Sequence, residues 1–89
     1  MLQQTTTIVN KLGLHARAAA KFVTQASQFD SEINVKRNNQ DVNGKSIMGI
    51  MMLAAAKGSE IELIIDGTDE KQAMLSLLEL IANRFGEAE

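Results

Sequence analysis

The order of apolar patterns along this chain of 89 residues constrains its fold more than any other feature. Stretches rich in β-branched or alternating apolar residues, which predict strands, lie at residues 5–9, 33–36, 41–43 and 60–65. Stretches that predict helices lie at residues 16–28, 47–53 and 68–85. The resulting order, β-α-β-β-α-β-α, predicts a single α+β domain over residues 1–89. We expect a two-layer sandwich in which helices cover one face of one sheet. Periodicity does not reveal the order of the strands.

The first and last predicted helices each have one apolar face. In the first helix this face is formed by Ala19, Phe22, Val23 and Ala26, and the opposite, polar face by Arg17, Lys21, Thr24 and Gln28. In the last helix the apolar face is formed by Ala73, Met74, Leu77, Ile81 and Phe85. Gly86 then stands where a C′ glycine commonly ends a helix. Both helices are therefore predicted to pack on the sheet through these faces.

The composition excludes several kinds of site and partner. With no cysteine and a single histidine, the chain offers no disulfide, thiol nucleophile or zinc site. Its net charge is −2, it has no basic block, and it lacks Trp and Tyr to stack on bases, so we expect no nucleic-acid partner. The longest apolar run, Ile47 to Ala56, is far shorter than the roughly 20 residues that span a bilayer, and no secretion signal precedes it. We expect a cytoplasmic protein without membrane insertion, metal or cofactor.

The only histidine, His15, lies where an extended segment is predicted to give way to a helix. Imidazole is a competent nucleophile near neutral pH, and a helix N-terminus favours anions through its free N–H groups and its dipole. Gly13 allows the loop to approach a ligand closely. The amides of Ala16 and Arg17 fall in the first turn, and the guanidinium of Arg17 suits phosphate oxygens. These residues together predict a site that carries a phosphoryl group on His15.

A second interpretation of His15 stays open at this point. An isolated histidine at a helix entry is more often a capping or exposed residue, and the chain would then be a ligand-binding module on a similar sandwich. Hydrolysis and acyl transfer are not supported, because the loop around His15 contains no Asp or Glu to act as a base and the chain has no Ser, His and Asp set.

The segment Gly13-Leu14-His15-Ala16-Arg17, followed by Ala19-Ala20, resembles the active-site motif of HPr, the histidine-containing phosphocarrier family of the bacterial sugar phosphotransferase system. The similarity continues through the loop 43–48 and through residues 56–58. It implies a four-stranded antiparallel sheet covered on one side by three helices. It also implies a carrier rather than an enzyme: His15 is phosphorylated on Nδ1 by enzyme I at the expense of phosphoenolpyruvate, and passes the group to an enzyme IIA domain, with Arg17 as the partner of the phosphate.

The chain departs from the family pattern at Ala18, where proline usually follows the arginine. Proline suits the start of a helix because its φ is fixed and its missing N–H has no partner to lose. Alanine is at least as compatible with a helix and returns a backbone donor close to the anion site. We therefore expect the site to survive this change. The rate of phosphoryl transfer and the choice of partner are the properties that we expect it to affect.

Ser46 precedes the second predicted helix, where a serine commonly accepts a hydrogen bond as the N-cap. The resemblance implies a further role, regulatory phosphorylation by an ATP-dependent HPr kinase/phosphorylase. About two negative charges beside the docking surface would then weaken phosphoryl transfer at His15. Gly44-Lys45-Ser46 is not a nucleotide-binding P-loop, because that motif requires a glycine at position 39, which is Asn39.

The second predicted helix is apolar all round, which complete burial in so small a domain does not explain. We expect Ile50 and Leu53 to face the core. We expect Ile47, Met48 and Met51 to form an exposed patch beside His15 that, with Ala20 and Lys21, docks enzyme I and enzyme IIA domains. The carrier itself is expected to be a monomer. A nitrogen-branch or purely regulatory HPr-like protein is the nearest alternative, since it would share the histidine motif.

Overall fold

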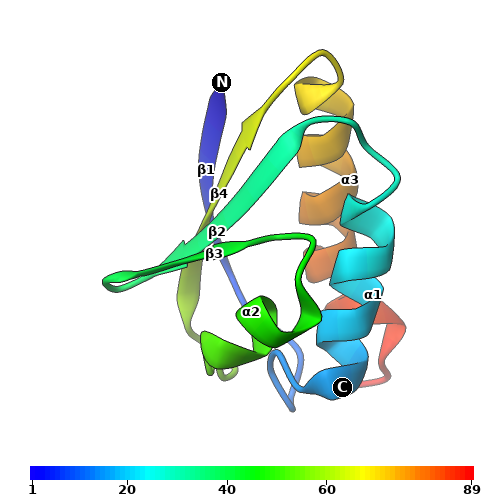
Figure 1. Cartoon of the computed structure of the whole chain (residues 1–89). Helices are drawn as coiled ribbons and strands as arrows, with labels where there is room; N and C mark the ends of the chain where they lie inside the picture. Colours follow the sequence, from blue (N-terminus) through cyan, green and yellow to red (C-terminus); the bar gives the residue numbers. More distant parts are fainter.

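The computed structural model describes all 89 residues as an open-faced sandwich of one sheet and one layer of helices (Figure 1). The elements follow one another as β1 (Leu2–Thr7), α1 (Ala16–Ala26), β2 (Glu32–Arg37), β3 (Gln40–Asn43), α2 (Ile47–Met52), β4 (Glu60–Asp66), α3 (Glu70–Ala82) and a short 3₁₀ turn (Arg84–Gly86). The predicted α+β class and the predicted order of the seven elements are confirmed.

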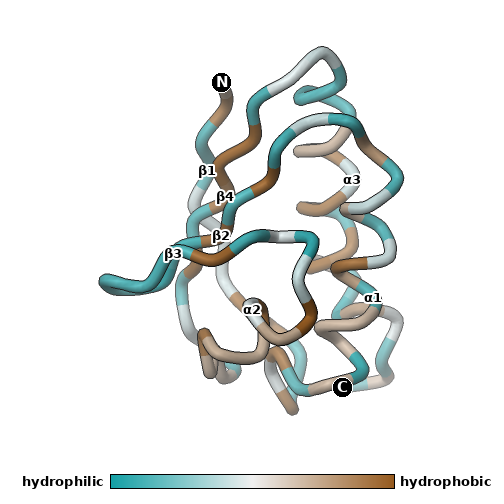
Figure 2. Tube along the Cα trace, in the orientation of Figure 1, coloured by the Kyte–Doolittle hydropathy of each residue, from teal (hydrophilic) through white to brown (hydrophobic).

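The sheet has the order β1-β4-β2-β3, and each neighbouring pair is antiparallel. The last strand in the sequence, β4, therefore lies between the first two and pairs with both. Ile65 of β4, for example, is opposite Leu2 on one side and Ile33 on the other. The hairpin between β2 and β3 extends away from the helices and is hydrophilic along its tip (Figure 2).

The core lies between the sheet and the three helices. One face of β4 contributes Ile61, Leu63 and Ile65, and their intervening neighbours are more accessible, as the alternation predicts. The predicted inward residues of α1 are buried, apart from the half-buried Val23, and Met74 of α3 is core as well. The predicted outward residues of α1 are all exposed. Helical and strand periodicities therefore specify one shared core.

The predicted first strand is displaced: β1 runs from Leu2 to Thr7 instead of Thr5 to Val9. Its position is set by pairing with β4 along that whole length. Beyond Thr7 the chain leaves the regular ladder but stays bonded to the loop before β4, since Ile8 donates to Ser59 O at 2.9 Å and accepts from the Gly58 amide at 2.7 Å.

The end of the last helix was also predicted wrongly, because α3 stops at Ala82 instead of continuing to Phe85. Arg84, Phe85 and Gly86 all have positive φ, at 58°, 54° and 77°, so the chain turns through a left-handed segment. Phe85 is fully buried, as predicted, but it reaches the core from this turn. Gly86 thus ends the turn and is not the C′ residue of α3. The first helix, α1, ends two residues earlier than predicted, at Ala26.

None of the helices combines the length and the apolar character needed to cross a lipid bilayer.

Candidate functional site

The loop before α1 is held against the segment that follows α2. Gly13 has φ +68°, and a Cβ atom there would lie 2.5 Å from the carbonyl oxygen of Ala55. The next amide, that of Leu14, donates to the same oxygen at 2.9 Å. The conformational freedom of Gly13 is therefore used for close contact between two backbones. This packing fixes the residue that follows, His15.

His15 is the N-cap residue of α1, with extended backbone angles, as its position in the sequence predicts. Its side chain does not bond the helix amides. The first intrahelical bond runs from the Ala19 amide to His15 O at 2.8 Å, so the amides of Ala16 and Arg17 have no acceptor within the helix. The dipole and these free donors make the space beside His15 favourable for an anion.

The His15 ring is bound on one side only. Its Nε2 lies 2.5 Å from Oε2 of Glu87, which comes from the C-terminal segment 72 residues away. No hydrogen bond is formed by Nδ1. The imidazole is partly exposed, while the Glu87 side chain is only 12% exposed. The accessible lone pair of the ring is therefore at Nδ1 when Nε2 carries the proton.

Glu87 is in turn held by Asn10, a fully buried residue. The Asn10 side-chain amide donates to Oε1 of Glu87 at 3.0 Å and to the carbonyl oxygen of Gly13 at 2.8 Å. The hydrogen bond from Asn10, and then the hydrogen bond and charge of His15 and the charge of Arg17, lower the pKa of the Glu87 carboxyl, with burial acting in the opposite direction. Glu87 is thus kept as a carboxylate next to the histidine.

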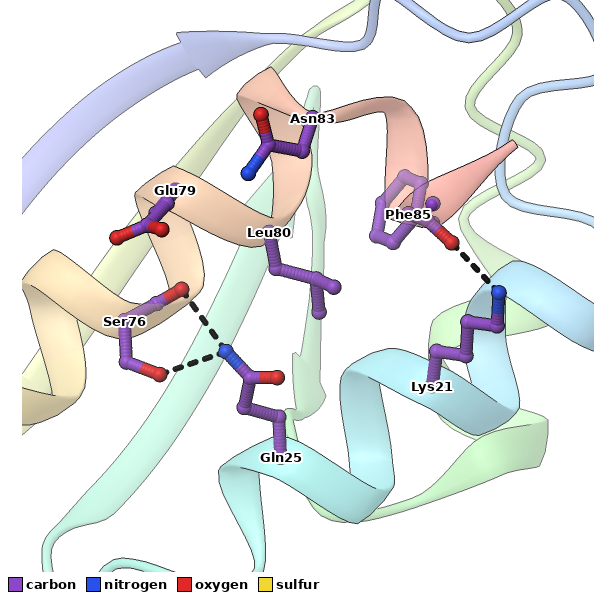
Figure 3. A pocket seen from close by; sticks show the side chains of 8 residues that line it. Lys21, Gln25, Ser76, Glu79, Leu80, Asn83 and Phe85 are labelled. Atoms are coloured by element: carbon purple, nitrogen blue, oxygen red, sulfur yellow. Dashed lines mark hydrogen bonds between the residues drawn. The ribbon is translucent and has the colours of Figure 1, made fainter. Parts of the chain in front are cut away.

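The C-terminal segment is anchored by one bond to α1 and one bond to the loop before it, and α1 is bonded to α3 at a third place. Figure 3 shows the Lys21 side chain reaching from α1 to the carbonyl oxygen of Phe85, at 2.7 Å, across an open pocket between α1 and α3. Deeper along the same two helices, Gln25 donates to the backbone and hydroxyl oxygens of Ser76. The backbone of Lys11 donates to Glu89 O at 3.0 Å. These contacts hold the turn that leads to Glu87.

Arg17 is exposed and makes no ion pair or hydrogen bond. It lines an open hollow of about 310 Å³ next to the Glu87 side chain and Leu12. Its guanidinium is therefore free to bind an arriving anion. Ala18, by contrast, is fully buried in the first turn of α1, so this departure from the family pattern is accommodated within a regular helix.

Ser46 caps α2 as predicted: its Oγ accepts from the Gly49 amide at 3.0 Å. The loop before it is fixed by Asn43, whose side-chain oxygen accepts from the Lys45 amide at 2.8 Å, and by the Lys45 ammonium, which donates to the carbonyl oxygen of Phe29 at 2.6 Å. Lys45 thus joins this loop to the segment that follows α1.

The second helix, α2, turns Ile50 to the core, with Leu53 directly after it, and leaves Ile47, Met48 and Met51 exposed, as predicted. Met52 is exposed as well. Figure 1 places α2 at the same end of the molecule as the start of α1, and Figure 2 shows most of α2 on the hydrophobic side of the scale. Ala20 is half-buried and Lys21 is exposed on α1. The apolar residues of α2 therefore lie at the same end of the molecule as the start of α1, and Ala20 and Lys21 lie further along that helix.

Two residues of the site, Asn10 and Glu87, were not identified from the sequence. The loop around His15 contains no acidic residue, and the acidic partner of the ring comes from the other end of the chain. An asparagine before the glycine of the loop was a weak signal, because that residue type is common in turns. No group of three or more His, Cys, Asp or Glu side chains is placed to hold a metal ion.

Residues 2–83 match the sequence model of a family described as "PTS HPr component phosphorylation site". The chain belongs to the HPr family. It is 62% identical, over the full length of both chains, to the phosphocarrier protein HPr of Neisseria meningitidis. Among solved structures, HPr-C-His from Thermoanaerobacter tengcongensis is similar with a TM-score of 0.96, at 48% identity over all of both chains.

A second structure from Thermoanaerobacter tengcongensis, described as an HPr dimer, is similar with a TM-score of 0.79 at 49% identity, and covers 98% of this chain and all of the other. The membership supports a phosphocarrier of the phosphotransferase system and fits a carrier that is not itself an enzyme. Asn10 lies within the part of the chain that the family's sequence model matches, whereas Glu87 lies beyond it.

Proposed function

We propose that this member of the HPr family accepts a phosphoryl group on Nδ1 of His15 from enzyme I and donates it to enzyme IIA domains. The observation that carries the proposal is the state of the His15 ring at the N-terminus of α1. Its Nε2 is bonded to Glu87, while Nδ1 is unbonded beside a helix start that favours anions.

Phosphoryl transfer to Nδ1 of His15 forms one bond to phosphorus and breaks another, and it needs no further reactant. The lone pair of Nδ1 forms a bond to phosphorus as the bond between phosphorus and the donor atom breaks, and that electron pair leaves with the donor. The proton on Nε2 stays in place, so the ring gains positive charge while the phosphoryl group brings negative charge. Arg17 and the amides of Ala16 and Arg17 are the proposed partners of the phosphoryl oxygens. Transfer to an acceptor is the reverse of this step.

The direct test is incubation with phosphoenolpyruvate and enzyme I, followed by intact mass and phosphorus NMR. We expect one acid-labile, base-stable phosphate on the wild-type chain and none on His15→Ala, whose fold should be intact because the His15 side chain is partly exposed. A His15→Ala chain that still takes the phosphate would contradict the assignment of the site, and an unlabelled wild-type chain would contradict the function.

Docking is proposed to use one surface for donor and acceptor, made of Ile47, Met48 and Met51 of α2 with Ala20 and Lys21 of α1. Exposed methionines adapt to more than one partner. Lys21 is exposed, but its ammonium already donates to the carbonyl oxygen of Phe85. When an acidic partner binds, the Lys21 ammonium is therefore expected either to keep its bond to Phe85 or to exchange that bond for one to the partner.

The sugar branch is the proposed pathway, because the Ser46 loop resembles that of kinase-regulated HPr. A nitrogen-branch or regulatory carrier is distinguished by parallel assays with a sugar-type and a nitrogen-type enzyme I: the branch is given by the enzyme that phosphorylates His15 faster.

Regulation is proposed at Ser46 through an ATP-dependent kinase. The hydroxyl lies at the start of α2, next to the proposed docking residues, so a phosphate there would add charge where partners bind. Labelling with ATP that disappears in Ser46→Ala would support this role, and labelling that persists would contradict it.

The chain is proposed to act as a monomer, and sedimentation at working concentration tests this against the dimer that a relative forms.

A further inference from the structure

We propose that Glu87, held by Asn10, is a positioning residue that fixes the proton of His15 on Nε2 and thereby presents Nδ1 as the phosphoryl acceptor. This inference rests on the proposed phosphocarrier function and assigns a role within that site to two residues from opposite ends of the chain. Glu87 contacts the ring at Nε2, on the side away from the reacting nitrogen.

The contact selects one of the two tautomers of the neutral ring. A carboxylate accepts hydrogen bonds and donates none, so the proton between Glu87 and His15 belongs on Nε2. Nδ1 is then left with its lone pair. The ionised form of Glu87 is favoured by the hydrogen bond from the amide of Asn10 and by the charge of Arg17, both of which lower the pKa of this carboxyl beside a neutral His15 ring.

The same carboxylate supports the charge that develops during transfer. As Nδ1 bonds to phosphorus, the ring becomes cationic with its proton still on Nε2, and the hydrogen bond to Glu87 becomes a charge-assisted one. Because Glu87 contacts the ring at Nε2, its negative charge is closer to the ring than to the phosphoryl group, which arrives at Nδ1. Arg17, which lines the adjoining hollow, offsets the remaining repulsion.

The orientation of the Asn10 side chain serves Glu87 but leaves one buried oxygen atom of Asn10 without a hydrogen bond. Both hydrogens of its side-chain amide are used, on Glu87 and on Gly13, and its own Oδ1 is buried without any partner. The reverse orientation would set Oδ1 against two acceptor oxygens, so Glu87 and Gly13 together determine the orientation present. A buried polar atom left unsatisfied calls for an explanation, and the placement of Glu87 supplies one.

Anchoring of the C-terminal segment does not require the contact between Glu87 and His15. That segment is already fixed by the buried ring of Phe85, by the bond from Lys21 to the Phe85 carbonyl, and by the backbone bond from Lys11 to Glu89. The Glu87 side chain is thus available to act on the histidine.

The decisive variant is Glu87→Gln, which keeps the shape and removes the charge. Because Asn10 donates to this residue, the carboxamide oxygen of the new side chain is expected to face Asn10, and its NH₂ group to face Nε2 of His15. An NH₂ group there favours the tautomer with the proton on Nδ1, which removes the lone pair that should attack phosphorus. Glu89→Gln is the matched control, since it makes the same chemical change two residues further along, in a side chain that does not touch His15.

Two measurements are made on the wild type and both variants. The ring ¹⁵N chemical shifts of His15, recorded at alkaline pH where an imidazole carries one ring proton, report the tautomer without any phosphoryl donor. The rate of phosphoryl acceptance from enzyme I reports the consequence. We expect the Nε2–H tautomer in the wild type and in Glu89→Gln, a shift towards Nδ1–H in Glu87→Gln, and acceptance by Glu87→Gln slower by about tenfold or more.

A tautomer in Glu87→Gln that matches the wild type would overturn the proposal, as would equal acceptance rates for Glu87→Gln and Glu89→Gln. Failure of the phosphocarrier function is a separate result. In that case the wild type accepts no phosphate, while the ¹⁵N shifts still report whether Glu87 sets the tautomer. Glu87→Ala, which removes the contact altogether, should give a mixture of both tautomers, and a single Nε2–H form there would also count against the proposal.

Discussion

At the scale of single residues, Gly13 places His15 through a backbone conformation that other residues adopt only with strain. Its φ is +68°, and the Ala55 carbonyl occupies the space where a Cβ atom would be. The bond from the Leu14 amide to the same carbonyl closes the contact. Gly13 therefore allows the loop before the histidine to pack against Ala55. The sequence predicts that a glycine is needed there, but it does not predict which residue packs against it.

Gly13→Ala should destabilise the protein by about 2 kcal/mol or more, since both the positive φ and the contact with Ala55 oppose a methyl group. Urea denaturation followed by circular dichroism measures this loss. The control is Gly58→Ala, because Gly58 also has a positive φ, of +90°, yet nothing lies within 4 Å of its added Cβ. Equal losses in the two variants would mean that backbone strain alone, without the Ala55 contact, determines the cost.

At the scale of elements, α2 shows how a six-residue helix can be apolar on nearly every side and still belong to a small domain. It needs few inward residues, since Ile50 and the adjacent Leu53 are fully buried. The Ser46 hydroxyl stabilises its first turn. The remaining apolar side chains face outward, which is why the fold of the domain does not account for them.

Met48→Asp should weaken binding of enzyme I by about tenfold, because a charge would be placed within an apolar contact, and it should change the melting temperature little. Isothermal calorimetry and thermal unfolding measure the two effects. Leu75→Asp of α3 is a matched control, since Leu75 is 70% exposed and Met48 75%. If both variants bind enzyme I as the wild type does, α2 is not part of the docking surface.

The end of α3 marks the limit of prediction from helical periodicity. Phe85 follows Ile81 at the spacing of one helical turn, so the pattern continues although the helix does not. The chain instead enters the left-handed turn, which is bonded to Lys21 from another helix and directs Phe85 into the core. Periodicity reports that a side chain is buried, and here it could not report which backbone conformation buries it.

At the scale of the whole molecule, the site depends on contacts between residues far apart in the chain. The motif around His15, its position at a helix start and the exposed face of α2 could all be predicted, because each is carried by neighbouring residues. The position of β4 between β1 and β2 could not be predicted, and neither could the pairing of His15 with Glu87 across 72 residues. Only the assembled fold specifies such pairs.

The connection between the segment that follows α1 and the start of α3 includes one acid, Asp69, that should make the stability of the fold depend on pH. Asp69 accepts hydrogen bonds from the backbone amides of Asp30, at 2.9 Å, and Ser31, at 3.0 Å, and from the Ser31 hydroxyl. The bond from the Ser31 hydroxyl, followed by those from the two amides, lowers the pKa of Asp69. The carboxylate thus ties the segment between α1 and β2 to the start of α3.

A carboxyl whose pKa is lower in the folded state stabilises the fold above its unfolded pKa, and this contribution is lost as the pH falls through the folded value. Asp69→Asn should therefore lower the melting temperature at neutral pH, and its difference from the wild type should shrink as the medium is acidified below about pH 4. Asp30→Asn is the control, because that variant keeps the backbone amide that Asp69 binds. Thermal unfolding across this pH range measures both. A difference between Asp69→Asn and the wild type that stays constant from neutral to acidic pH would mean that the charge of Asp69 is not what joins these two segments.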